Sequence, residues 1–303
     1  MNRIKLSLAL LGAVFASLVS ASAADAAPLR QADWAAAKKF VTLPSGLRMA
    51  YVELGDPQGA PLLLLHGFTD NSRSWSLVAP HLGRYRLLIP DQRGHGASAA
   101  PECCYGSIQM AHDAREFLDA LNIGRAGVAG HSMGSMIAIA MAAEYPDRVD
   151  RIALLGSTAL APVKRGDWLW TNVAASRFPL DRNTQFMREW HPAAQPTPVD
   201  AEFAAAAMDD ILAVKPQVWR GVMRELADTP VARHAADVKA PVLVLSGGAD
   251  PIFPAEHHAA LLRSFPGAGG HVYPGLGHNF LWEQPEDVGR RLDEFFGAGR
   301  GER

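Results

Sequence analysis

The segment Gly130-His131-Ser132-Met133-Gly134 constrains the fold of this chain more than any other feature of its sequence. It follows a short apolar stretch at 126–129 and precedes an apolar stretch at 133–145 that Pro146 ends. A serine on a sharp turn between a strand and a helix requires glycines two residues before and after it, because the two elements cross closely there. The pattern therefore predicts a strand, a tight turn with an exposed serine hydroxyl, and a helix.

Strands and helices alternate on both sides of this turn. Apolar runs predict strands at 38–43, 48–54, 61–65, 85–90, 151–155, 241–245 and 271–273. Helical spacing of apolar residues predicts helices at 107–121 and 285–296. This alternation predicts an α/β fold in which helices cover both faces of a mostly parallel central sheet.

The alternation stops between Ser157 and Lys239. This stretch is rich in tryptophan and proline, and helical segments at 201–214 and 217–226 are its clearest elements. We expect a helical cap or lid at 158–239, inserted between two parts of one core at 24–157 and 240–303. The apolar side chains of this segment are expected to pack over another part of the protein. The segment begins near the strand ends that carry Ser132. The side chains expected to contact a substrate are Trp168, Trp170 and Phe186.

A serine hydroxyl is a weak nucleophile and needs a base. His278 stands in a glycine-rich loop after the last predicted strand, and Asp250 follows the strand before it. Both therefore lie at strand ends, as Ser132 does. The order Ser132, Asp250, His278 predicts a catalytic triad with Ser132 as nucleophile, His278 as base and Asp250 as the acid that orients the imidazole.

The oxyanion of such a reaction needs backbone donors. We expect them at Phe68, which follows His66-Gly67 after the 61–65 strand, and at Met133, the first residue of the helix. Asp70 and Asn71, just beyond Phe68, either face the pocket or lie in a solvated loop, and the solvated loop is the expectation.

Three other histidines are weighed as the base. His131 precedes the serine in an extended segment, so its side chain should point to the opposite side, toward the sheet. His257 and His258 fall in a predicted surface helix. None of the three is expected to be the base.

At these residues the sequence resembles the α/β-hydrolase superfamily, in its esterase, lactonase and perhydrolase-like branch. The motifs occur in the family's order over roughly 38–296: His66-Gly67-Phe68, Asp91-Gln92-Arg93-Gly94-His95-Gly96-Ala97-Ser98, the segment around Ser132, Asp250 with Pro254, and Gly277-His278. The second motif is expected to be structural, with Gly94 and Gly96 allowing the turn and Arg93 as a buried pairing group.

The resemblance implies hydrolysis of a carboxylic ester or a lactone through an acyl-enzyme intermediate. Serine at position 132 argues against epoxide hydrolases and haloalkane dehalogenases, which carry aspartate there. Carbon–carbon bond hydrolases and cofactor-free perhydrolases use the same triad and remain open. A non-catalytic binding protein of the same fold is the remote alternative, since such relatives usually lack one triad member.

The first residues of the chain predict export. Arg3 and Lys5 precede an apolar run of 14 residues, Leu6 to Val19, and Ala21-Ser22-Ala23 offers a cleavage site. The run is shorter than the roughly 20 residues that a membrane-spanning helix needs. We therefore expect residues 1–23 to be a cleavable signal peptide. The mature protein is expected to be secreted or periplasmic, without a stable membrane anchor.

Composition limits the partners of the chain. The formal net charge is −2, so no basic excess points to nucleic acid. Neither an H-E-x-x-H motif nor a Cys/His cluster occurs, so no metal or cofactor is expected. The expected partner is a small ester or lactone. The two cysteines, Cys103 and Cys104, are adjacent, and a strained bond between them or two free thiols both remain open.

Overall fold

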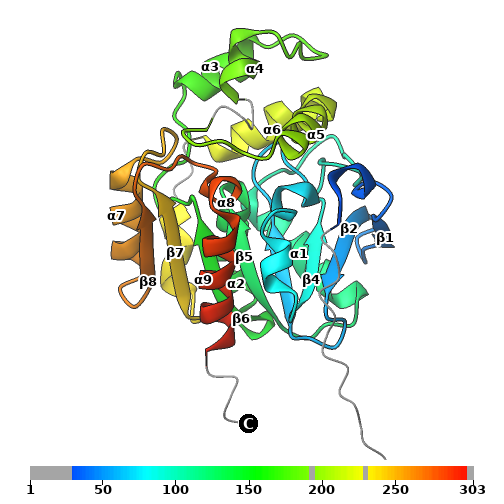
Figure 1. Cartoon of the computed structure of the whole chain (residues 1–303), viewed down its shortest axis with the longest axis vertical. Coiled ribbons are helices and arrows are strands. Elements are labelled where there is room, and N and C mark those ends of the chain that lie inside the picture. Colours follow the sequence, from blue (N-terminus) through cyan, green and yellow to red (C-terminus); the bar gives the residue numbers. More distant parts are fainter. Residues whose placement is uncertain (1–28, 191–194, 228–230, 299–303) are drawn as a thin grey trace, which may run out of the picture.

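A computed structural model describes residues 29–190, 195–227 and 231–298 of the chain (Figure 1). The predicted signal peptide at 1–23 lies outside these described residues. An eight-stranded sheet forms the centre, in the order β1-β2-β4-β3-β5-β6-β7-β8. The strands are β1 (Lys39–Thr42), β2 (Arg48–Gly55), β3 (Pro61–Leu65), β4 (Arg86–Pro90), β5 (Ala126–His131), β6 (Val149–Leu155), β7 (Val242–Gly247) and β8 (Gly269–Tyr273).

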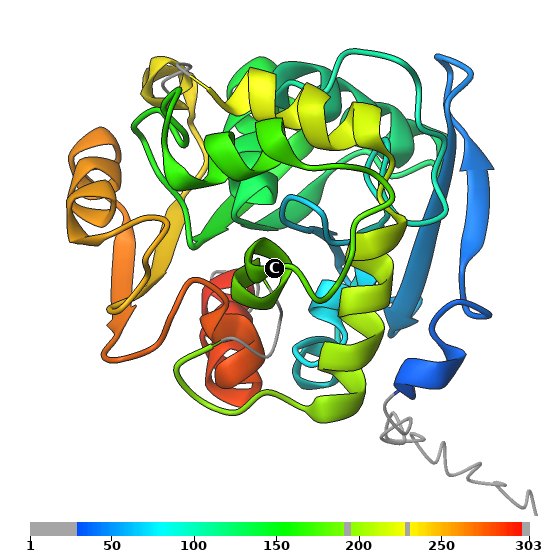
Figure 2. The same ribbon diagram turned by 90° about the horizontal axis from the view of Figure 1, so that it is seen from above.

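The sheet is mostly parallel, as the sequence predicts. β2 pairs antiparallel with both β1 and β4, and all the other neighbouring strands are parallel. Figure 2 shows β1 and β2 at one edge of the sheet and β8 at the opposite edge. The central strand β3 is a run of leucines because both of its faces are covered.

Helices cover both faces of the sheet, which confirms the predicted fold class. Leu63 and Leu65 of β3 pack in a core with α1 and α2, whereas Leu62 and Leu64 pack on the other side with Phe296 of α9. The helices of the core are α1 (Ser107–Ala120), α2 (Met133–Glu144), α7 (Ala255–Ser264), α8 (Phe280–Glu283) and α9 (Pro285–Gly297). Short 3-10 helices span Gln31–Asp33, Ser72–Trp75, Ala79–Leu82, Pro146–Arg148 and Val231–Asp237.

Among the described residues between β6 and β7, four α-helices lie above one end of the sheet (Figure 1). They are α3 (Trp168–Ala175), α4 (Gln185–Trp190), α5 (Ala201–Ala213) and α6 (Pro216–Leu226). The Asp200 side chain caps α5 by accepting the N–H of Phe203 at 2.7 Å, and Pro216 begins α6 with its fixed φ. No strand occurs among the described residues of 158–239, only an isolated bridge between Val163 and Ala227.

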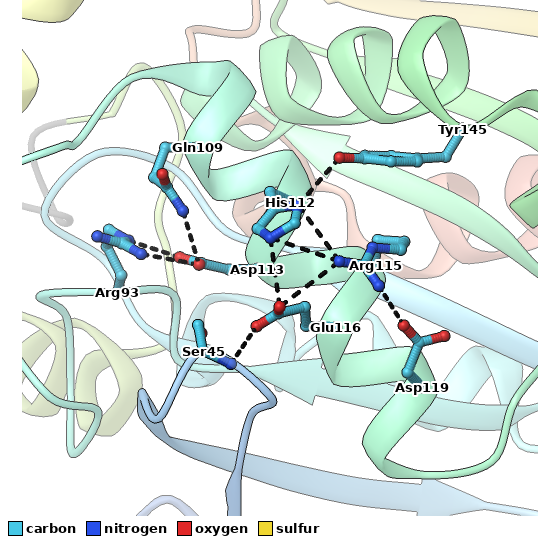
Figure 3. A network of polar contacts seen from close by, with 9 residues as sticks. All are labelled: Ser45, Arg93, Gln109, His112, Asp113, Arg115, Glu116, Asp119 and Tyr145. Atoms are coloured by element: carbon cyan, nitrogen blue, oxygen red, sulfur yellow. Dashed lines mark hydrogen bonds and ion pairs between the residues drawn. The ribbon is translucent and has the colours of Figure 1, made fainter.

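The segment after β4 has the structural role expected of it. Gly94 and Gly96 have positive φ angles of 83° and 53°. The Arg93 guanidinium is buried and donates to both carboxylate oxygens of Asp113 on α1, at 2.5 and 2.8 Å. Figure 3 shows this pair, with Gln109 as a second donor to Asp113. The pair ties the segment after β4 to α1.

The two adjacent cysteines form a disulfide. Cys103 and Cys104 are bonded to each other in the loop before α1. Over the described ranges, no helix is both long and apolar enough to cross a membrane.

Candidate active site

Ser132 lies at the sharp turn between β5 and α2, with φ 51° and ψ −120°. A Cβ atom at Gly130 would lie 2.2 Å from the carbonyl oxygen of Gly134, and one at Gly134 would lie 2.3 Å from that of Leu65. Only glycine fits at these two positions. The N–H of Ser132 donates to the Leu155 carbonyl at 2.9 Å, which fixes the turn against the end of β6.

His278 and Asp250 form a buried hydrogen-bonded pair. The distance between His278 Nδ1 and Asp250 Oδ2 is 2.7 Å. The other oxygen of Asp250 accepts the N–H groups of Ile252 and Phe253 at 2.8 and 2.9 Å. The His278 ring also contacts the Phe253 ring edge-on, at 5.2 Å between centroids. These contacts hold the imidazole in one orientation.

The charge state of Asp250 follows from its surroundings. Burial disfavours its charged form, but the attraction and hydrogen bond of His278 and the N–H groups of Phe253 and Ile252 outweigh burial and lower the pKa of Asp250. Asp250 is therefore ionised at neutral pH and accepts the Nδ1–H of His278. This bond leaves Nε2 of His278 as the nitrogen that can take a proton from another group.

One cavity of about 510 Å³ lies between the strand ends and the cap helices, and both Ser132 and His278 line it. Ser132 follows β5, Asp250 follows β7 and His278 follows β8, so the structure brings the three predicted triad residues to the same end of the sheet. Among the described residues, no cluster of His, Cys, Asp or Glu is arranged to hold a metal ion.

The loop after β3 presents the first expected oxyanion donor. His66 Nε2 accepts the backbone N–H of Gln92 at 2.9 Å, so its Nδ1 carries the hydrogen and donates to the Gly67 carbonyl at 2.8 Å. This bond fixes the peptide between Gly67 and Phe68, whose C=O and N–H point in opposite directions. Met133 begins α2, so its N–H has no acceptor within the helix.

The three cap residues expected to contact a substrate lie in different places. Trp168 lines the cavity. Phe186 is buried behind it, with its ring 5.5 Å from that of Trp168 and 6.0 Å from that of Trp219. Trp170 lines a separate hollow formed by α3 and α6, and the Arg165 guanidinium lies 4.9 Å from its ring centre. The sequence does not show how α3 is rotated, so it could not separate Trp168 from Trp170.

Several lining residues were missed by the sequence analysis. The expected solvated loop at Asp70 and Asn71 is wrong: Asp70 lines the cavity with its side chain only 10% exposed, and Asn71 is buried. Cap residues cover this loop, and Trp190 Nε1 donates to Thr69 Oγ1 at 3.0 Å. The other missed lining residues include Glu189, Trp190, Gln195, Ile211, Ile252, Asn279 and Trp282.

His131, which also lines the cavity, and Glu283 hold the loop that carries His278. His131 is buried and its Nε2 lies 3.2 Å from the carbonyl oxygen of His278. Glu283 of α8 accepts the N–H of Gly277 at 2.9 Å and both the N–H and the hydroxyl of Thr197, at 2.9 and 2.7 Å. Glu283 therefore joins the loop of His278 to the cap, a role that no sequence pattern indicated.

This chain is similar to known proteins in both its sequence and its fold. A family model described as alpha/beta hydrolase fold matches residues 60–285. The acetyltransferase component of an acetoin cleaving system from Pseudomonas putida is 31% identical over 82% of this chain and 67% of its own length. Lipase 1 from Psychrobacter immobilis is 40% identical, over 39% of this chain and 38% of the lipase. A thermophilic esterase structure from Thermogutta terrifontis has a TM-score of 0.72 and 26% identity, covering 86% of this chain and 98% of the esterase.

Proposed function

Because the chain belongs to the α/β-hydrolase fold family, we propose that it is a serine hydrolase that cleaves carboxylic ester or lactone bonds. The observation that carries this proposal is the pair of Asp250 and His278 at 2.7 Å, beside the same cavity that the strained Ser132 lines. A positive φ at a non-glycine residue is uncommon, and it is found where function requires it.

The proposed reaction has two acyl-transfer steps. The Ser132 hydroxyl attacks the carbonyl carbon while Nε2 of His278 takes its proton, and the N–H groups of Phe68 and Met133 stabilise the oxyanion. The intermediate collapses, the C–O bond breaks, and His278 returns the proton to the departing alkoxide. Water, with His278 again as base, then hydrolyses the acyl-enzyme and releases the acid.

The walls of the cavity suit the apolar acyl group of an ester. Ring faces and aliphatic side chains dominate the lining, as expected for a site that binds acyl chains and excludes water during acyl transfer. The partial similarity to Lipase 1 supports the same class of substrate. Carbon–carbon bond cleavage and perhydrolysis are alternatives that need the same triad, and the experiment below includes them as outcomes.

The test uses p-nitrophenyl esters of rising chain length and a set of lactones. We expect Ser132→Ala to lower kcat by about 10³-fold or more, because its hydroxyl forms the acyl-enzyme. The matched control is Ser264→Ala at the end of α7, which should keep wild-type rates. A serine-directed phosphonate should label the wild type and not Ser132→Ala. Ester hydrolysis that survives Ser132→Ala would exclude the proposal, and turnover confined to diketones or peroxide would select an alternative.

We also propose that the protein is exported with cleavage after residue 23, on the basis of the N-terminal pattern of the sequence. Expression of the full chain in a bacterial host should give a periplasmic or secreted product. Its intact mass should correspond to a chain beginning at Ala24. An uncleaved chain in the cytoplasm would contradict export.

A further inference from the structure

The cavity beside Ser132 contains a carboxyl group that the proposed reaction does not use. Asp70 lies in the loop after β3, two residues beyond the oxyanion donor Phe68, and its side chain is nine-tenths buried. Among the described residues, no lysine or arginine lies within ion-pair distance of it. Burying a carboxylate without a positive partner lowers the stability of the folded protein. A positively charged ligand would supply that partner to Asp70.

The histidine nearest to Asp70 is not its counter-ion. His131 Nδ1 lies 4.0 Å from Asp70 Oδ2. Nε2 of His131 must carry a hydrogen to donate to the His278 carbonyl, because a carbonyl oxygen only accepts. Burial and the nearby His278 lower the pKa of His131 to about 3, so the ring is neutral and presents the bare lone pair of Nδ1 toward Asp70.

Asp70 also lies close to the reacting atoms. A Cβ atom at Gly67 would lie 2.9 Å from Asp70 Oδ2 and 3.3 Å from Ser132 Cβ. Asp70 Oδ2 and Ser132 Cβ thus flank the small space that Gly67 leaves open. A ligand group that contacts Asp70 must be within a few bonds of the carbonyl carbon that Ser132 attacks.

The rest of the cavity wall is aromatic and acidic. The rings of Trp168 and Trp190 stack at an angle of 27° with centroids 6.2 Å apart, and Trp190 packs edge-on against Phe68. Glu189 lies at the rim, where it accepts the indole N–H of Trp168 at 3.0 Å. The described lining residues include no lysine or arginine. Aromatic faces combined with carboxylates are the chemistry that binds substituted ammonium groups.

We propose that the cavity selects esters that carry a substituted ammonium group close to the scissile bond, with Asp70 as its counter-ion. This inference rests on the proposed ester hydrolysis and names its substrate class. The positive group can belong to the alcohol, as in a choline ester, or to the acid, as in an ester of trimethylglycine. Both place the charge within a few bonds of the carbonyl carbon, where Asp70 lies.

The protonation of Asp70 makes this preference depend on pH. Burial raises its pKa to about 7, against the opposing effects of His278 and the Gly67 N–H. The other charged groups around it are Glu189 at the rim and Asp210 of α5, which pairs with Arg73 at 2.6 Å. A bound cation therefore meets a carboxylate above neutral pH and a neutral carboxylic acid in mild acid.

The first experiment measures binding and needs no turnover. Choline and its uncharged analogue 3,3-dimethylbutan-1-ol are titrated against the wild-type protein at about pH 8, with the fluorescence of the cavity tryptophans as readout. We expect choline to bind about tenfold more tightly or better. The difference should shrink at about pH 5.5 and in Asp70→Asn. The control Asp209→Asn, which removes an exposed carboxylate on α5, should keep the wild-type ratio.

The second experiment identifies the side of the ester that carries the charge. The kcat/KM of acetylcholine is compared with that of 3,3-dimethylbutyl acetate, and that of the trimethylglycine ethyl ester with that of ethyl 3,3-dimethylbutanoate. One cation-to-neutral ratio should fall about tenfold in Asp70→Asn and stay constant in Asp209→Asn.

Equal binding of choline and its neutral analogue, or ratios that Asp70→Asn leaves unchanged, would overturn the inference. Hydrolysis of the neutral esters through Ser132 would then still support the proposed function. Ester hydrolysis that survives Ser132→Ala would instead exclude the proposed function, whatever the result for Asp70→Asn.

Discussion

Ser132 adopts a backbone conformation that costs about 1–3 kcal/mol for a non-glycine residue. The structure maintains it through its neighbours rather than through the serine itself. Gly130 and Gly134 let the strand, the turn and the helix pack without a Cβ between them, and the N–H of Ser132 is held by Leu155. The strained conformation of Ser132 is thus maintained by the close packing that Gly130 and Gly134 allow.

The clearest residue-scale prediction concerns Gly134. We expect Gly134→Ala to destabilise the protein by about 3 kcal/mol or more, because its Cβ would lie 2.3 Å from a backbone oxygen of β3 that cannot move away. The measurement is the midpoint of urea unfolding. Gly124→Ala is the matched control, since a Cβ there meets no atom within 4 Å and its midpoint should stay near that of the wild type. Similar midpoints for both variants would contradict the close packing described here.

The sequence predicted that Ser132, Asp250 and His278 lie at strand ends, but it did not predict the burial of Asp70. Ser132, Asp250 and His278 each follow an apolar strand, so their positions derive from local patterns that can be recognised. The loop that carries Asp70 is contacted by a cap residue, Trp190, whose indole N–H donates to Thr69 from more than a hundred residues away. No local pattern records a contact of that kind.

Among the helices and strands, the central strands could be predicted from the sequence. The sequence could not predict which face of a cap helix points into the cavity. β3 and β7 are continuous apolar runs whose ends differ by at most two residues from the prediction. The cap helices α5 and α6 were also predicted, with ends that differ by one residue from the structure. The short helix α3 has only 8 residues, and its orientation depends on packing against α6 and the aromatic rings around Phe186.

The two tryptophans of α3 allow a matched test of the cap. Trp168 lines the cavity and is 46% exposed, whereas Trp170 faces the hollow between α3 and α6. We expect Trp168→Ala to change the chain-length preference of kcat/KM by about tenfold with a small change in Tm. Trp170→Ala should leave the preference unchanged, because its ring has no contact with the cavity. The same ester panel and thermal unfolding of both variants provide the comparison.

If both substitutions shift the preference equally, the cap acts on specificity through its overall position rather than through the ring of Trp168. If neither does, the acyl group contacts only the core side of the cavity.

For the molecule as a whole, two buried carboxyl groups act on stability in opposite directions. Asp250 has a lowered pKa, so its contribution to the free energy of unfolding is present above its unfolded pKa and is lost as the pH falls through its folded value. Asp70 has a raised pKa. Its contribution is present below the unfolded pKa near 4 and is lost as the pH rises toward 7. A group that lowers stability at neutral pH suggests a functional requirement.

The raised pKa of Asp70 predicts how its replacement changes stability with pH. Asparagine at position 70 cannot ionise, so Asp70→Asn should gain stability over the wild type as the pH rises from about 4 to 7, and the gain should level off above 7. One pKa unit corresponds to about 1.4 kcal/mol, so the gain should approach at most about 4 kcal/mol. Urea unfolding across this range measures it, with exposed Asp209→Asn as the control whose difference from the wild type should stay constant. A difference for Asp70→Asn that is also constant between pH 4 and 8 would mean that Asp70 is ionised throughout. The carboxylate would then be stabilised within the protein itself, and the cavity would have no need of a positively charged ligand.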